Sequence, residues 1–469
     1  MADSSGKKSR IAIVGGGLVG AMQACYMAQR GYTVDLYESR EDIRRAEHVA
    51  GRSINLALSV RGRSALRHIG LEEEVVKSGI PMHARLIHSL DGKKSAQPYG
   101  TKGEAILSVD RRKLNELLLS AAEKVESVTM HFHHRLSQLD LDNGILHFTD
   151  KNDHKVEAHA DLIFGCDGAY SCVRRQLMRK TLIDFSQEYI PHGYMELCVP
   201  PVPGTDGQHN MEINYLHIWP RNEFMMIALP NQDGSFTLTL FMPFKEFEGI
   251  KAQGDEGVLA FFEKYFPDAI EKIGVQSLKE TYNSSTHLPL VSIKCSPYHY
   301  QDKAVIMGDA SHAMVPFYGQ GMNCGFEDCL VFNEIMDQFD GDFAKVLPHY
   351  STFRGPDAKA ICDLAMYNYV EMRSLVNSRW FLFRKKVDWL LNWFLPSKYI
   401  PLYSMVTFSR IRYHMVINKW KKQDKIVNNG LILLGLSSLG MLVWLISRGR
   451  QMQIGKLTEM LTERIQDFF

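Results

Sequence analysis

Three glycines near the start of the chain, Gly15, Gly17 and Gly20, have the spacing of a turn that binds a nucleotide pyrophosphate. An apolar run at 11–14 precedes them and predicts a buried strand, and the residues after them predict a helix that stops at Gly31. Gly15 permits the tight turn, Gly17 lets a phosphate approach the backbone, and Gly20 lets helix and strand pack closely. The pattern therefore predicts a helix N-terminus that faces a pyrophosphate.

An acidic residue supports the nucleotide interpretation. A second strand, predicted over 33–37, ends at Glu38, roughly 20 residues after the last glycine, where such folds place an acid that accepts hydrogen bonds from a ribose hydroxyl. A glycine-rich turn alone would be a weak signal. The strand, the helix and the acid together predict a dinucleotide site, but they do not distinguish NAD from FAD.

Two further turns combine glycine with aspartate. One is Asp167–Gly168 in "GCDGAYSCVR", and the other is Gly308–Asp309 in "VIMGDASHAMVPFYGQGMN". Asp309 ends a predicted strand and can hydrogen-bond a ribityl chain, and a helix that begins near 321–323 can direct its N–H groups at the O2 side of a flavin. An NAD-dependent dehydrogenase would continue instead with strand–helix units and a catalytic His, Tyr or Lys.

With these three motifs in this order and at wide separation, the chain resembles the single-component FAD-dependent aromatic hydroxylases. The resemblance implies FAD as the cofactor and NADPH as a transient reductant, since the sequence has no second dinucleotide fingerprint. It also implies ring hydroxylation by a flavin C4a-hydroperoxide, so that the cofactor carries the chemistry. The protein then has to exclude water and orient the aromatic ring.

The resemblance assigns site residues along most of the chain. No side chain is expected to act as an acid or a base, and the loop residues Pro316, Phe317, Tyr318 and Gln320 are expected to shape the reactive face. The expected cofactor contacts are Gly15, Gly17, Val19, Gly20, Tyr37, Glu38, Arg40, Ala57, Arg111, Leu136, Asp167, Cys172, Asp309, Met322 and Asn323. The chain departs from the family pattern at Asp110, Arg112 and Cys172, where we expect altered surroundings of the cofactor without loss of binding.

The same resemblance implies a substrate that carries an α-carboxylate. Arg85 and Tyr99 are expected to bind this group, and Asn368 and Tyr403 to complete the pocket. The guanidinium fork of arginine matches a carboxylate bidentately, and tyrosine adds a neutral donor. Taken alone, Arg85 would more often be a solvated arginine at a strand edge. An aromatic wall is expected from 217–226 and 240–244, with Phe241 as one member.

Composition narrows the possible partners and compartments. The net charge of +1 over 469 residues gives no reason to expect nucleic acid as a partner. Eight cysteines are scattered without zinc-ligand spacing, which predicts reduced thiols facing the cytosol and no metal site. The N-terminus lacks the apolar segment of a secretory signal.

The C-terminal part of the chain predicts a membrane anchor. No charged residue occurs over 426–447, which is about 33 Å of helix, and basic residues flank the stretch. The alternative is a buried helix of a soluble core. Aromatic and basic residues over 379–394 suit a membrane interface or an aromatic helix packed on the catalytic domain. The amphipathic tail, 448–469, could lie on the membrane or on a partner.

These observations predict an α/β protein with a discontinuous, Rossmann-like FAD-binding domain at 8–180 and 291–350. An antiparallel-sheet substrate domain at 181–290 is inserted in it, followed by a helical region at 351–425 and a single transmembrane helix. The resemblance implies a place on the mitochondrial outer membrane, facing the cytosol. Two alternatives stay open: a membrane-bound flavin epoxidase of an apolar, squalene-type substrate, and a non-catalytic, membrane-tethered FAD-binding scaffold.

Overall fold

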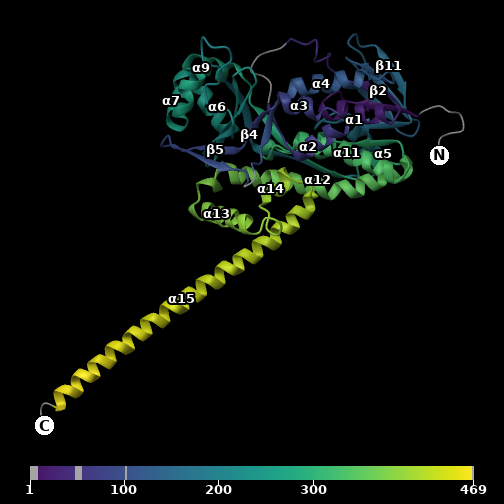
Figure 1. The fold of residues 1–469 in the computed structure, drawn as a ribbon. Helices are drawn as coiled ribbons and strands as arrows, with labels where there is room; N and C mark the ends of the chain where they lie inside the picture. The colour runs from purple at the N-terminus through teal and green to yellow at the C-terminus, as the bar shows by residue number, and fades with distance from the viewer. Residues whose placement is uncertain (1–8, 48–54, 101–102, 467–469) are drawn as a thin grey trace. The chain divides into compact units, whose positions relative to one another are not determined.

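The computed structural model describes residues 9–47, 55–100 and 103–466 (Figure 1). Two compact units divide the chain, Met1–His414 and Met415–Phe469. All the strands and the predicted site belong to the first unit.

The first unit contains a six-stranded sheet in the order β18-β19-β12-β1-β2-β8, in which all neighbours are parallel except β18 and β19. The strands are β1 (Arg10–Val14), β2 (Thr33–Tyr37), β8 (Val128–His131), β12 (Leu162–Gly165), β18 (His299–Tyr300) and β19 (Ala304–Ile306). The central strands are continuous buried runs, as expected where helices cover both faces of a parallel sheet. Since β19 pairs with β12, segments far apart in sequence build one sheet, as a discontinuous nucleotide domain requires.

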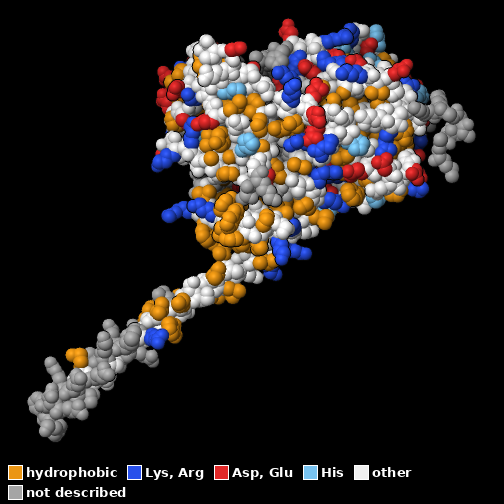
Figure 2. Space-filling model, viewed as in Figure 1, with side chains coloured by type: hydrophobic (Ala, Val, Ile, Leu, Met, Phe, Trp, Pro, Cys, Tyr) orange, Lys and Arg blue, Asp and Glu red, His pale blue; other side chains and the backbone are white. Residues whose placement is uncertain are grey.

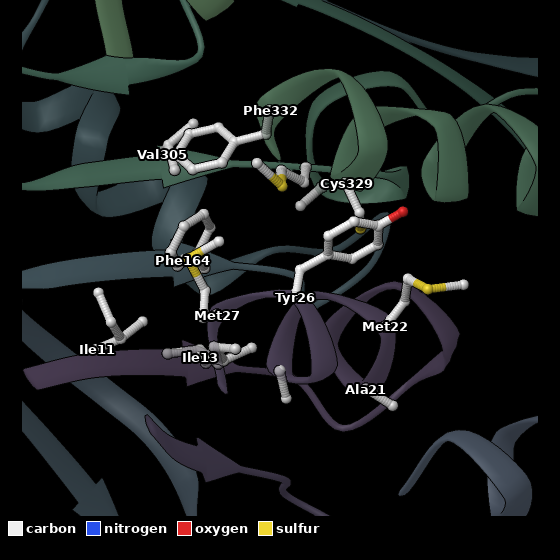
Figure 3. Close-up of a cluster of buried hydrophobic side chains, with 14 of the residues drawn as sticks. Ile11, Ile13, Ala21, Met22, Tyr26, Met27, Phe164, Val305, Cys329 and Phe332 are labelled. Carbon is white, nitrogen blue, oxygen red and sulfur yellow. The ribbon is translucent and has the colours of Figure 1, made fainter. Parts of the chain in front are cut away.

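Helices α1 (Leu18–Gln29) and α11 (Gly321–Gln338) pack with this sheet into the larger hydrophobic core. Figure 3 shows Tyr26 of α1, Phe164 of β12 and Phe332 of α11 pointing into one cluster. The predicted helix start at 321–323 is therefore confirmed, and the core holds both helix N-termini at fixed positions beside the sheet.

Smaller elements complete the nucleotide-binding part. One three-stranded sheet has the order β11-β10-β9, and another has the order β3-β7-β4. Their bounds are β3 (Asn55–Leu58), β4 (Ile80–Met82), β7 (Ile106–Asp110), β9 (Arg135–Asp140), β10 (Ile145–Thr149) and β11 (Lys155–His159). The helices are α2 (Val60–His68), α3 (Glu72–Ser78), α4 (Arg111–Glu123) and α5 (Cys172–Lys180). Asp110 accepts the N–H of Lys113 and so caps α4.

The inserted sheet has seven strands in the order β17-β13-β16-β15-β14-β5-β6. They are β5 (Ala84–His88), β6 (Lys94–Pro98), β13 (Asp184–Val199), β14 (Tyr215–Arg221), β15 (Phe224–Pro230), β16 (Phe236–Pro243) and β17 (Leu288–Ser296). The predicted boundary of 181–290 is therefore too narrow, because β5 and β6 join this sheet and β17 runs past its end. β5 pairs in parallel with the edge of β14, and this long-range pairing leaves no local signal in the sequence.

Helices cover one part of this sheet, where the sequence predicted strands. They are α6 (Phe244–Ala252), α7 (Gly254–Tyr265), α8 (Pro267–Ile273) and α9 (Val275–Ser284), and α6, α7 and α9 lie together at one end of the unit (Figure 1). Their apolar faces and the sheet form a second hydrophobic core. The sequence predicts a domain dominated by an antiparallel sheet, and the structure adds helices over 244–284.

The end of the first unit is helical, as predicted for 351–425. Short segments α10 (Asp309–His312) and η1 (Pro316–Tyr318) lead into α11. They are followed by α12 (Phe343–Arg373), η2 (Leu375–Asn377), α13 (Arg379–Phe394) and α14 (Leu402–Thr407).

The second unit is made almost entirely of α15 (Tyr413–Gln466). Its part Tyr413–Arg448 is long and apolar enough to cross a membrane, and none of its most apolar window is buried. Apolar side chains such as Leu433 and Leu434 are exposed along it (Figure 2). This helix fits a membrane anchor. The predicted tail is helical as far as Gln466, and 467–469 lie outside the described residues.

Candidate active site

A cavity of about 790 Å³ in the first unit is bounded by the nucleotide-binding sheet, the inserted sheet and the η1–α11 loop. Most of the residues predicted to contact a cofactor line it. They are Gly15, Gly17, Val19, Tyr37, Glu38, Arg40, Ala57, Arg111, Leu136, Asp167, Cys172, Asp309 and Met322. Arg85, Tyr403, Pro316, Phe317 and Tyr318 line it as well. The fold therefore assembles one continuous space from motifs about 300 residues apart.

Gly20 and Asn323 are predicted contacts that do not line the cavity. A Cβ at Gly20 would lie 1.8 Å from the carbonyl oxygen of Gly15, so this glycine allows the close approach of helix and turn. Asn323 donates to the carbonyl oxygens of Ala57 (2.8 Å) and Gly319 (2.7 Å) and accepts the N–H of Ser59 (2.8 Å). Both residues therefore position residues that line the cavity without lining it themselves.

The glycine turn offers a cradle for a pyrophosphate. Gly15 has a φ of +107°, which side chains rarely adopt, and a Cβ there would meet the carbonyl oxygen of Cys166 at 2.4 Å. At Gly17 no atom lies within 4 Å of a Cβ position, and this residue borders the cavity. Gly17 is the N-cap of α1 and supplies no side-chain cap. The first N–H groups of α1 are thus available to an anionic group.

Glu38 is held as a carboxylate at the end of β2. Its Oε2 accepts the N–H of Gly16 (2.8 Å), and its Oε1 accepts both the N–H and Nε of Arg40 (2.9 Å each). Burial acts to raise the pKa of Glu38, but these hydrogen bonds outweigh it and the pKa is lowered. The residue stays charged and can accept from a ribose hydroxyl, as the sequence predicts.

The two aspartates of the Gly–Asp turns differ in what they do. Asp167 caps α5, because its Oδ2 accepts the N–H groups of Cys172 (2.6 Å) and Val173 (3.1 Å). Asp309 lines the cavity, and its side chain is accessible from it; desolvation by the surrounding protein raises its pKa, and the charge of Arg111 opposes this. Both aspartates line the cavity. Asp167 is engaged with the start of α5, and contact of Asp309 with ribityl hydroxyls stays a prediction.

The other end of the cavity contains a buried cation. Arg85 on β5 donates from Nη1 to Glu371 Oε1 of α12 (3.2 Å), and its guanidinium lies 4.5 Å from the centroid of the Tyr403 ring. Burial acts to lower the pKa of Arg85, but the interactions with Tyr403 and Glu371 outweigh this and the pKa is raised overall. The guanidinium is therefore always charged. The buried Nε has no hydrogen-bond partner among the described residues. Arg85 lines the cavity, and a permanent guanidinium charge at its wall suits an anionic substrate group.

Tyrosines surround this cation. Tyr403 stacks with Tyr99 (centroids 5.1 Å apart) and with Tyr318 (5.5 Å apart). Burial raises the pKa of Tyr99 and of Tyr318 well above the ordinary value, so both remain neutral. Tyr99 does not itself line the cavity; it supports Tyr403, which does.

Asn368 and Gln320 are placed away from the cavity wall. Asn368 donates to the carbonyl oxygen of Phe317 (2.7 Å) and contacts the sulfur of Met372 (3.1 Å). Gln320 accepts the hydroxyl of Tyr413 (3.0 Å). In this structure the two side chains fix the η1–α11 loop, and direct contact of Asn368 with a substrate stays a prediction.

The inserted sheet supplies the apolar wall. Phe241 lines the cavity and meets Phe317 edge-on, with centroids 4.8 Å apart. The prediction for 217–226 is wrong, because Trp219 and Met226 pack in the second hydrophobic core. The wall comes instead from neighbours on the other face of the strands: Tyr194, Leu216, Ile227, Leu229, Thr237 and Thr239. Alternation along each strand could have indicated two faces, but not which one borders the cavity.

Glu371 is a site residue that the sequence analysis missed. It is buried on α12, accepts from Arg85 and also accepts from Lys385 Nζ of α13 (3.2 Å). Burial acts to raise its pKa, and the two cations lower it overall. Its position three residues after Asn368, on the same helix face, was the available signal.

A buried ion-pair network supports the second Gly–Asp turn from α11. Asp328 Oδ2 accepts from His312 Nε2 (2.6 Å) and the N–H of Gly308 (2.9 Å), and Oδ1 accepts from Arg354 Nε (2.7 Å). Burial acts to lower the pKa of His312, but Asp328 raises it overall and is itself held charged. Cys324 completes three potential metal ligands within 4.8 Å, which the sequence spacing did not predict. Since Arg354 already neutralises Asp328, we interpret the group as an ion-pair network.

Comparisons with known proteins agree with this geometry. Residues 8–363 match a family model described as an FAD binding domain. The chain is 55% identical over 435 residues to the kynurenine 3-monooxygenase of Sus scrofa, covering 93% of this chain and 91% of that protein. It is 51% identical over 463 residues to that of Anopheles gambiae, covering 98% and 93%.

Solved structures share the fold at lower identity. Pseudomonas aeruginosa PqsL in complex with 2-aminobenzoylacetate has a TM-score of 0.63 at 20% identity, covering 78% of this chain and 97% of that one. The tetrameric form of 2-methyl-3-hydroxypyridine-5-carboxylic acid oxygenase has a TM-score of 0.63 at 20% identity, covering 79% and 94%.

Proposed function

The chain belongs to the kynurenine 3-monooxygenases, and from this we propose that it hydroxylates L-kynurenine at ring carbon 3, with FAD, NADPH and O2. The residues present fit FAD, because a Cβ at Gly17 would fill the cradle at the start of α1 and Glu38 is held as a carboxylate beside it. FAD supplies the activated oxygen when bound. The family resemblance drawn from the motifs is thereby confirmed, and the individual site residues are proposals.

Arg85 is the observation that carries the substrate assignment. Arg85 lines the cavity with a largely buried guanidinium, whose charge can attract an α-carboxylate, and tyrosine rings pack around it. Phe241 and Phe317 then lie where an aromatic ring can be oriented. The aromatic amine of kynurenine makes the ortho carbon electron-rich, so the protein has to position the ring and needs no base.

We also propose that the protein is anchored by 426–447 in the mitochondrial outer membrane with its first unit facing the cytosol. The exposed apolar helix, flanked by basic residues, supports an anchor. All eight cysteines are free, which suits a reducing compartment. Fusion of 415–469 to a fluorescent protein, imaged with markers of mitochondria and of the endoplasmic reticulum, tests the location.

The test of the reaction follows NADPH consumption by the detergent-solubilised full chain, with and without L-kynurenine, and weighs the product. Stimulated consumption and a product heavier by one oxygen atom support the proposal. If the FAD-loaded protein shows no response to kynurenine, the fold and the cofactor assignment stand, and the substrate assignment is wrong. A squalene-type epoxidase has no use for a buried Arg85, and a non-catalytic scaffold would show no stimulated consumption at all.

A further inference from the structure

Helix α13 exposes an aromatic stripe. Trp380, Phe383, Val387, Leu390 and Phe394 follow at spacings of three and four, which places them on one face of the helix. None of the residues of α13 is buried, and Trp380 and Phe394 are each 64% exposed. Figure 2 shows hydrophobic side chains gathered over this helix. A soluble surface rarely presents such a contiguous patch without a partner.

The composition of α13 fits a lipid headgroup region. Two further tryptophans, Trp389 and Trp393, are exposed on other sides of the helix, and Arg379 and Lys386 provide exposed positive charge. Tryptophan and basic side chains favour the membrane–water interface. The apolar stretch 426–447 follows in the same chain, so an anchored protein keeps α13 tethered to a bilayer.

The opposite face of α13 is connected to the substrate end of the cavity by charge. Lys385 Nζ lies 3.2 Å from Glu371 Oε2, and Glu371 Oε1 lies 3.2 Å from Arg85 Nη1. Glu371 is thus shared between a cation on the surface helix and the cation at the cavity wall. Without Lys385, Glu371 would pair with Arg85 alone. The substrate carboxylate would then have to compete for Arg85 with a more strongly bound Glu371.

A second connection leads from α13 to Tyr403. Asp388 Oδ1 accepts the hydroxyl of Tyr399 (2.5 Å), and Asn392 Nδ2 donates to the carbonyl oxygen of Tyr399 (2.8 Å). Tyr399 lies in the segment that leads to Tyr403, whose ring is covered by Arg85. The position of α13 therefore affects both the cation and the aromatic ring beneath it.

We propose that α13 lies on the bilayer surface through its aromatic stripe, and that Lys385 is a positioning residue which sets the affinity of Arg85 for the substrate carboxylate. The membrane then acts as an effector of substrate binding. Because the two events are coupled, free energy gained when α13 binds the bilayer appears as a change in the affinity of Arg85 for the substrate. This inference rests on the proposed function, because it takes Arg85 as the carboxylate site.

The coupling is tested with the full chain in vesicles of phosphatidylcholine and phosphatidylserine. Lys385→Met should raise KM for L-kynurenine about tenfold, within the range usual for coupled sites, with a smaller effect on kcat. Lys385→Arg should restore KM, and Lys386→Met, which removes a neighbouring exposed charge, should leave it unchanged. FAD absorbance confirms folding. An unchanged KM in Lys385→Met, or an equal rise in Lys386→Met, would overturn the coupling.

The lipid contact is tested with vesicles that contain brominated phosphatidylcholine, which quenches nearby tryptophan fluorescence. Replacing Trp380, the tryptophan of the stripe, by Phe should remove a quenched component, while Trp219→Phe, buried in the inserted sheet, should not. An unquenched Trp380 would overturn the lipid contact and direct attention to a second copy or a soluble partner. If the wild-type chain ignores kynurenine, the proposed function fails, and the quenching result still decides the lipid contact.

Discussion

Arg85 and Glu371 form a buried ion pair, 3.2 Å from Nη1 to Oε1, which joins strand β5 of the inserted sheet to helix α12. The residue expected to bind a carboxylate therefore already has one as a partner. Glu371 is shared with Lys385, so the attraction of Arg85 for an incoming anion is only partly satisfied. If Arg85 binds the substrate carboxylate as proposed, substrate affinity depends on that division of charge.

Replacing Arg85 tests the carboxylate site. Arg85→Ala should raise KM for L-kynurenine by about 10- to 100-fold, since a hydrogen bond to a charged group contributes about 1.5–3 kcal/mol. Arg85→Lys should give a smaller rise, because lysine keeps the charge but lacks the bidentate fork. Steady-state kinetics of FAD-loaded protein measure this, and an unchanged KM in Arg85→Ala would show that the carboxylate binds elsewhere.

Substitutions at two glycines, Gly17 and Gly20, distinguish an effect on cofactor binding from an effect on folding. Gly17→Ala should fold, because no atom lies within 4 Å of the new Cβ, but it should weaken FAD binding because that Cβ enters the cavity. Gly20→Ala should instead disrupt the fold, since its Cβ would lie 1.8 Å from the carbonyl oxygen of Gly15. Circular dichroism and FAD titration distinguish the two. A Gly17→Ala protein with full FAD affinity would contradict the pyrophosphate cradle.

Breaking the buried ion-pair network around Asp328 should lower the free energy of unfolding substantially. Asp328→Asn leaves His312 without its counter-ion and removes one of the two carboxylates that Arg354 contacts, Glu327 remaining at 2.9 Å. The loss of one partner of a buried pair costs about 3–5 kcal/mol. Asp337→Asn, which removes an exposed ion pair with Arg30, should cost about 1 kcal/mol or less. Thermal unfolding followed by flavin release compares them, and equal midpoints would show that the network contributes little.

Stability should fall on mild acidification because of His217. Burial lowers the pKa of His217 to about 4, whereas an unfolded histidine titrates near 6.5. Between these values only the unfolded chain binds the proton, so stability is complete above pH 6.5 and declines towards pH 4. The loss at pH 5 is about 2 kcal/mol.

His217→Gln provides the comparison for this pH dependence. The variant should unfold earlier at neutral pH, since Nε2 of His217 donates to the carbonyl oxygen of Glu212 (2.8 Å), but its midpoint should change less between pH 7 and pH 5. His154→Gln, at an exposed site, should follow the wild-type pH profile. Parallel profiles for all three proteins would exclude His217 as the cause.

The sequence alone determined the nucleotide turn, the three motifs and the apolar C-terminal stretch. These features are local: the glycine spacing, the acid after β2 and the uncharged run depend on neighbours along the chain. For the same reason, the discontinuous α/β domain could be predicted.

Only the tertiary structure decided how the substrate end is built. β5 joins the inserted sheet by a long-range pairing with β14, Glu371 meets Arg85 across 286 residues, and Trp219 turns away from the cavity. Pairing between distant strands and the choice of face depend on which surfaces are buried together. That choice is made by the packing of the whole unit and has no signature in any short segment of sequence.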